Sequence, residues 1–158
     1  MQLQSSCVFQ AKTATTTIEN NLFYNGPRAG INFNDHFGGG DNVTGNVIFN
    51  QCRESGDHGP MNSWDRQPFF TDLRDPAGSW NPLFTETSRN IIIATYGGSQ
   101  GFDNDDGSTW EHIHDNVIYG EGLKQDYGGH DSIYENNLNL VHKYDGQNCF
   151  NTAPFKDG

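Results

Sequence analysis

The chain has 158 residues, of which 33% are hydrophobic, 13% are aromatic and 18% are charged, and its net charge is −11. This length suffices for one domain with a sizeable core, and the aromatic content argues against disorder. The negative charge excludes nucleic acid and an anionic membrane surface as expected partners, because phosphate binding needs a basic stripe. There is no apolar run long enough for a membrane-spanning helix.

Five copies of a short motif follow one another along the chain, each an asparagine that precedes a short apolar run. The anchor asparagines are Asn21, Asn46, Asn90, Asn116 and Asn137, with spacings of 25, 44, 26 and 21 residues. Three of these spacings match one coil of a solenoid. The longest spacing matches a coil that carries an insertion, which we place at residues 65–87 because this stretch is rich in Pro, Asp, Arg and aromatic residues.

The apolar runs are too short and too β-branched to be helices, and they are typical of buried parallel strands. We expect each anchor asparagine to occupy a corner with left-handed backbone geometry and to stack on the asparagine of the next coil, giving a hydrogen-bonded ladder.

A second wall of short strands advances in register with the first. It comprises residues 30–35, 60–65, 101–106 and 122–127, with a looser match at 147–150. We therefore predict an all-β fold, a right-handed parallel β-helix of about five coils, as one domain over residues 1–158. Residues 1–16 are left as a poorly defined start or cap, and we expect the chain to be a piece of a longer β-helix because no end caps are evident.

The runs 26–35, 54–68 and 103–108, together with the asparagine-anchored coils, resemble a group of large eukaryotic extracellular β-helix proteins in the pectate-lyase-like superfamily. The resemblance covers the chain from about Thr17. It implies the fold and an extracellular or cell-surface location, and it implies no particular reaction.

Alternation along the second wall predicts which side chains face outward. If Ile31, Met61, Phe102 and Leu123 point inward, then Asn32, Asn62, Asp103 and Lys124 form one exposed column, and Asn34, Trp64, Asp105 and Asp126 form the next. Such a patch of amides, carboxylates and an indole suits a sugar polymer. We add Arg66 as a ligand for a substrate carboxylate.

We expect catalysis, if present, from Asp103, Asp105, Asp106, Lys124 and His130. The analogy is with polygalacturonase-type hydrolases, which use aspartates on neighbouring coils, a Gly-His-Gly turn and a later basic residue. Here Gly129-His130-Asp131 lacks the second glycine, and Lys124 precedes the histidine. The alternatives are a turn with solvated acids and a plain ion pair of Lys124 with Asp103.

Asp103 and the three acids Asp105, Asp106 and Asp126 would bring four negative charges close together, and their repulsion must be relieved. We therefore expect either a Ca²⁺ site at Asp105, Asp106 and Asp126 or a protonated carboxyl at neutral pH. His112 and His114 lie two residues apart, so both can face one way as metal ligands, with polar corner residues as the alternative. His130 and Asp131 are sequence neighbours, and we expect His130 to need a carboxylate from another coil.

Three cysteines, Cys7, Cys52 and Cys149, are compatible with buried free thiols or with one disulfide and one thiol, and we favour three small apolar core residues. Asn42 begins a glycosylation sequon. The sequence thus leaves two functions open. One is an extracellular protein that binds or processes a polysaccharide as a hydrolase, lyase or epimerase. The other is a non-catalytic structural module of a fibre, cell wall or appendage, with end-to-end self-association.

Overall fold

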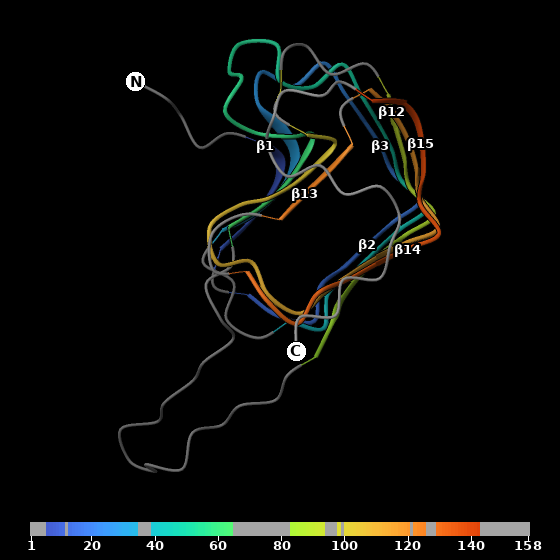
Figure 1. The fold of residues 1–158 in the computed structure, drawn as a ribbon. Coiled ribbons are helices and arrows are strands. Elements are labelled where there is room, and N and C mark those ends of the chain that lie inside the picture. Colours follow the sequence, from blue (N-terminus) through green and yellow to red (C-terminus); the bar gives the residue numbers. More distant parts are fainter. Residues whose placement is uncertain are drawn as a thin grey trace.

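The computed structural model describes residues 6–11, 13–34, 39–64, 83–93, 98, 100–120, 122–125 and 129–142. This part of the chain contains fifteen strands and no helix that could cross a membrane. The strands form three parallel five-stranded sheets (Figure 1). Sheet A comprises β1 (Ser6–Ala11), β4 (Ala29–Asn34), β7 (Met61–Trp64), β10 (Phe102–Asn104) and β13 (Leu123–Gln125).

Sheet B comprises β2 (Thr17–Glu19), β5 (Asn42–Thr44), β8 (Thr85–Ser88), β11 (Glu111–His114) and β14 (Ile133–Glu135). Sheet C comprises β3 (Leu22–Tyr24), β6 (Val47–Phe49), β9 (Ile91–Ile93), β12 (Val117–Gly120) and β15 (Leu138–His142). Each turn of the chain adds one strand to each sheet, so the protein is a right-handed parallel β-helix of about five coils, as predicted.

The recurring motif spans a corner rather than a single wall. Its residues before the anchor asparagine lie in sheet B, and the apolar run after it lies in sheet C. The sequence therefore predicted two walls where the structure has three, because the motif gives no separate signal for the bend. The second predicted wall corresponds to sheet A.

The five anchor asparagines form the predicted ladder. The Oδ1 atom of each anchor after Asn21 accepts a hydrogen bond from the backbone N–H of the anchor in the preceding coil, at 3.0 Å for Asn46, 2.9 Å for Asn90, 2.9 Å for Asn116 and 3.1 Å for Asn137. The side-chain amide of the preceding anchor donates to the same oxygen at 2.9–3.1 Å. The ladder thus joins all five coils at one corner.

The sequence predicted left-handed backbone geometry at the anchor asparagine itself. The structure instead has this geometry at the residue before the anchor. Asn20, Gly45, Arg89, Asp115 and Asn136 have φ between 53° and 68°. This position makes the bend from sheet B into sheet C, which leaves the anchor free to aim its amide along the helix axis. Asparagine, aspartate and glycine tolerate such backbone geometry best, so four of these five residues are of the expected types.

Inward-facing side chains of the three sheets fill the centre of the coil. The buried apolar cluster comprises Ile18, Ile31, Phe33, Val43, Ile48, Met61, Ile92, Phe102, Ile113, Ile118, Leu123 and Tyr134. Some inward positions are polar and bond to one another: Asn104 Nδ2 donates to the hydroxyl of Tyr134 at 2.6 Å, and Ser63 donates to Glu111 Oε1 at 3.0 Å. Each pair supplies hydrogen-bond partners to polar groups that burial has removed from water.

Some boundaries differ from those expected from the sequence. Ser6–Ala11, within the segment left as a poorly defined start or cap, form β1 and pair with β4. Of the predicted insertion 65–87, residues 65–82 lie outside the described part, while 85–87 belong to β8. The looser match at 147–150, including Cys149, also lies outside it. Cys52 is buried as expected, whereas Cys7 is exposed, and neither forms a disulfide.

The central member of the ladder generates a stability test. Asn90→Ala removes the side chain that accepts from the Asn46 backbone N–H and donates to the Val43 carbonyl and the Asn116 amide oxygen, all at a corner that excludes water. We expect a loss of about 2–4 kcal/mol in unfolding free energy, because orphaned buried groups cost about 1–3 kcal/mol each and relax in part. Chemical denaturation measures it. Asn21→Ala, at the exposed end of the ladder, should cost under about 1 kcal/mol, and equal effects for both variants would contradict the ladder's role.

Candidate functional site

The predicted outer column of sheet A exists in the predicted register. Asn32 pairs with Asn62, Asn62 with Asp103, and Asp103 with Lys124. The residues before each of them, Ile31, Met61, Phe102 and Leu123, point into the core as expected. Four polar side chains from four successive coils therefore line up on the outer face of one sheet.

The prediction that this column is exposed is wrong. Asn32, Asn62, Asp103 and Lys124 are only 1%, 4%, 1% and 8% exposed. Part of the cover is the connection between β6 and β7, residues 50–60, which is the wide green loop in Figure 1. Gly59 lies so close to Asp103 that an added Cβ would come within 3.1 Å of the Asp103 Cβ. The alternation of side chains along a strand predicts the direction in which each one points, but it cannot predict which other segment covers that face of the sheet.

Asp103 and Lys124 form a buried ion pair at the C-terminal end of this column. Lys124 Nζ lies 2.9 Å from Asp103 Oδ1 and 3.2 Å from Asp105 Oδ1, so one ammonium is shared by two carboxylates. Burial raises the pKa of Asp103 to about 6, and Lys124 opposes that rise. The neighbouring carboxylates of Asp105 and Asp57 contribute less. The main cause is thus loss of water rather than the acid–acid repulsion inferred from the sequence.

Two further ionisable groups join the cluster from the covering segment and the preceding turn. Arg28 Nη2 lies 2.6 Å from Nδ1 of His58, which is 4% exposed. Burial and the positive charge of Arg28 lower the pKa of His58 to about 4, so its ring is neutral at pH 7. Because Arg28 can only donate, Nδ1 is the acceptor and Nε2 carries the proton. This Nε2 has no hydrogen-bond partner among the described residues.

The other predicted residues lie at the rim or outside the described part. Asn34 and Trp64 are register partners and partly exposed. Asp105 and Asp106 are also partly exposed and follow β10 in a turn, where Ser108 donates to the Asp105 carbonyl at 2.8 Å. Arg66 and Asp126 lie outside the described residues, so the predicted Ca²⁺ ligands are represented only by Asp105 and Asp106. Asn42 is partly exposed at the start of β5.

His130 has a partner that the sequence argument ruled out. Its Nδ1 lies 2.6 Å from the carboxylate of its neighbour Asp131, and His114 contacts Asp115 in the same way at 2.8 Å. Both aspartates have positive φ, 54° and 55°. The alternation of side chains holds only for extended backbone, and a left-handed residue turns its side chain back toward its neighbour. His130 is thus paired at the corner between sheets A and B.

A second cluster was found only in part from the sequence. His112 and His114 do face the same way, and Glu86 joins them from β8, with the ligand atoms of all three within 4.8 Å of one another. Glu86 was overlooked because it fell in the predicted insertion. The signal was present, since Glu86 and His112 each stand four positions before their anchor asparagines, Asn90 and Asn116.

The raised pKa of Asp103 predicts a pH dependence of stability. A buried carboxyl with a folded-state pKa near 6 and an ordinary value of 3.8 binds its proton more tightly in the folded protein. Its stabilising contribution is therefore complete below about pH 4 and is lost as pH rises through about 6. Asp103→Asn should remove this pH dependence. The unfolding free energy of the variant, relative to that of wild type, should therefore increase by on the order of 2 kcal/mol from pH 4 to pH 7. Denaturation at each pH measures this.

The matched control is Asp106→Asn, which changes a partly exposed carboxyl three residues along the same segment. The comparison of the two variants shows whether the pH dependence belongs to the buried carboxyl of Asp103. If Asp103→Asn changes the unfolding free energy by the same amount at every pH, the raised pKa assigned to Asp103 is wrong.

Comparison with known proteins gives no family for this chain: no protein-family model, curated protein or solved structure matches it. The residues of the site are therefore the basis for a functional assignment.

Proposed function

We propose that this chain belongs to an extracellular carbohydrate-binding or carbohydrate-active protein, with its glycan site on the outer face of sheet A. The observation that carries the proposal is a group of buried hydrogen-bonding atoms without a partner among the described residues. Asn62 Nδ2 donates to Asn32 Oδ1 at 2.9 Å, and this leaves Asn32 Nδ2 and Asn62 Oδ1 unpaired. His58 Nε2 and Asp103 Oδ2 are unpaired as well.

These atoms offer both donors and acceptors across three neighbouring coils. Leaving such groups unsatisfied costs about 1–3 kcal/mol each, so they call for water or ligand hydroxyls. A sugar hydroxyl donates and accepts at once, which matches a row of amide, imidazole and carboxylate groups. Since the row is buried, we propose that a glycan chain enters at the rim, past Asp105 and Trp64, and displaces part of the 50–60 segment.

The pair of Asp103 and Lys124 supports proton transfer within this site. A carboxyl with a pKa of about 6 can carry a proton in mildly acidic surroundings and release it near neutral pH. Asp105, whose side chain is 31% exposed, shares the same lysine and is the carboxylate that a substrate meets first. The chemistry suits a hydrolase, a lyase or an epimerase, each of which moves a proton on or beside a sugar ring.

The outer face of sheet C favours the second candidate, a non-catalytic structural module. Its exposed side chains include Leu22, Tyr24, Ile91, Ile93, Tyr119, Leu138 and Leu140, all between 38% and 59% exposed. Tyr24 stacks on Phe49 of the next coil, with ring centroids 5.4 Å apart. A contiguous apolar face of this kind marks a protein–protein contact surface, so the rod would associate side by side.

The two candidates are separated by a pair of variants on different sheets. Asn62→Leu removes unpaired polar atoms from sheet A, and Tyr119→Ser removes an exposed ring from sheet C. We expect Asn62→Leu to lower affinity for an acidic or neutral polysaccharide at least tenfold, by about 1.4 kcal/mol, and Tyr119→Ser to leave it unchanged. Affinity gel electrophoresis over a polysaccharide panel measures binding, and release of reducing ends or unsaturated products reports turnover, which Asp103→Asn should reduce.

If no polysaccharide binds, or if Asn62→Leu binds as wild type does, the glycan proposal fails. Self-association of wild type that Tyr119→Ser abolishes, measured by analytical ultracentrifugation, would then support the structural module.

A further inference from the structure

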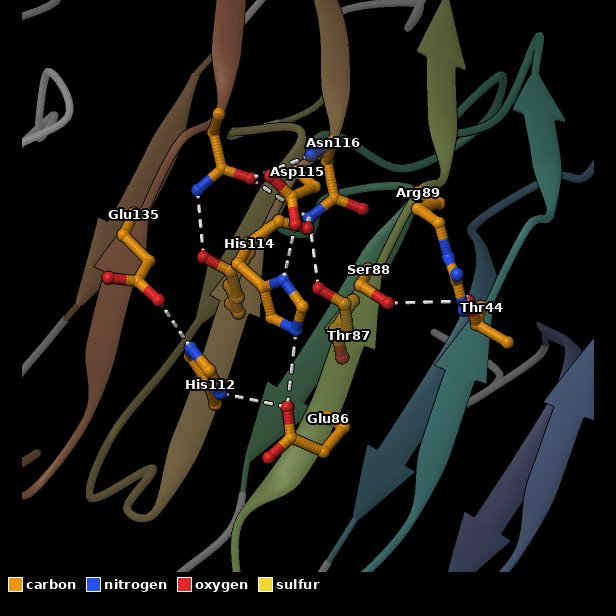
Figure 2. A network of polar contacts seen from close by, with 12 residues as sticks. Thr44, Glu86, Thr87, Ser88, Arg89, His112, His114, Asp115, Asn116 and Glu135 are labelled. Atoms are coloured by element: carbon orange, nitrogen blue, oxygen red, sulfur yellow. Dashed lines mark hydrogen bonds and ion pairs between the residues drawn. The ribbon is translucent and has the colours of Figure 1, made fainter.

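Two histidines and a glutamate converge on the outer face of sheet B (Figure 2). His112 and His114 alternate outward from β11, and Glu86 is the register partner of His112 on β8. Glu86 Oε2 lies 2.8 Å from His112 Nδ1 and 3.3 Å from His114 Nε2. The two imidazole rings stack with centroids 4.3 Å apart. One nitrogen of each ring therefore faces the same carboxylate oxygen.

The second nitrogen of each ring contacts a different carboxylate. His112 Nε2 lies 3.1 Å from Glu135 Oε1, and His114 Nδ1 lies 2.8 Å from Asp115 Oδ2. An ionised carboxylate only accepts hydrogen bonds, and both nitrogens of each ring contact one, so a neutral ring donates to one of its two carboxylates. In the tautomers that donate to Glu135 and Asp115, the nitrogens that face Glu86 carry lone pairs. Two lone pairs and a carboxylate oxygen then point at one another, an arrangement that a bound cation would stabilise.

We propose that Glu86, His112 and His114 bind one zinc ion through Oε2, Nδ1 and Nε2 respectively. In a tetrahedral site with bonds of about 2.0–2.1 Å, ligand atoms stand about 3.3 Å apart. The two separations from Glu86 Oε2, 2.8 and 3.3 Å, are close to this value, and the ligand atoms of all three residues lie within 4.8 Å of one another. Imidazole nitrogen selects zinc over Ca²⁺, which takes oxygen ligands, so this site differs in kind from the one predicted at Asp105 and Asp106.

The carboxylates next to the two histidines also favour zinc. Glu135 and Asp115 hold the two rings in the tautomers that ligation requires, as carboxylates behind zinc-bound histidines do. Three carboxylates around two neutral rings give the cluster a charge that attracts a dication. His112, His114 and Glu86 are 21%, 24% and 43% exposed, so a fourth zinc ligand can come from solvent. An open fourth position is where zinc enzymes hold a reactive water.

Zinc titration tests the proposal directly. The untagged protein is stripped with a chelator and titrated with Zn²⁺ by calorimetry near neutral pH, and Co²⁺ is used in parallel because its visible absorption reports tetrahedral ligands. We expect one equivalent of zinc with micromolar affinity or better. His112→Gln and His114→Gln should each weaken it at least 100-fold, and Glu135→Gln and Asp115→Asn about 10- to 100-fold.

The matched control is His130→Gln, because His130 forms the same kind of pair, with Asp131 at 2.6 Å, on another corner of the coil. Its affinity for zinc should equal that of wild type. The inference is overturned if wild type binds no zinc, or if the double variant of His112 and His114 binds it unchanged. Should a variant fail to fold, the wild type alone decides: zinc must raise its Tm, and an unchanged Tm overturns the site. The site lies on a different sheet from Asp103, so this outcome is independent of glycan binding.

Discussion

The asparagine ladder is the interaction on which the rest of this β-helix depends. Most strands in sheets B and C have only three residues, too few to fix their own register against slippage. Each anchor from Asn46 onward accepts hydrogen bonds from the preceding coil at a position that both sheets share, and these four anchors are between 0% and 4% exposed. The ladder therefore sets the register of two sheets at once, and sheet A follows because its strands lie on the same coils.

Register is also what creates the sites. Asp103 and Lys124 are 21 positions apart in the chain, yet they are neighbours because β10 and β13 pair residue for residue. Glu86 and His112 meet for the same reason on β8 and β11. Outward positions on successive coils form columns about 4.8 Å apart, so a short repeat can carry different chemistry on each face. Sheet A carries a buried ionic cluster, sheet B a histidine–carboxylate cluster, and sheet C an apolar surface.

The coil, the ladder and the inward columns were predictable because they follow directly from the periodic spacing of residues in the sequence. The anchor spacing and the alternation around Ile31 and Phe102 need no knowledge of tertiary contacts. What failed were features that depend on departures from regular strand geometry. The burial of Asp103 comes in part from a turn whose path no repeat encodes. The contact of His130 with Asp131 follows from one left-handed residue, and Glu86 was hidden because an insertion of irregular length interrupted the count of residues.

The direction of the bonds gives this rod an unequal response to force. The strand pairings and the asparagine ladder all run from coil to coil, along the axis, whereas the covalent backbone runs around it. A pull across the rod loads peptide bonds, but a pull along the axis loads only the hydrogen bonds and apolar contacts of one interface between coils. The protein should thus be stiff in cross-section and should yield to tension one coil at a time.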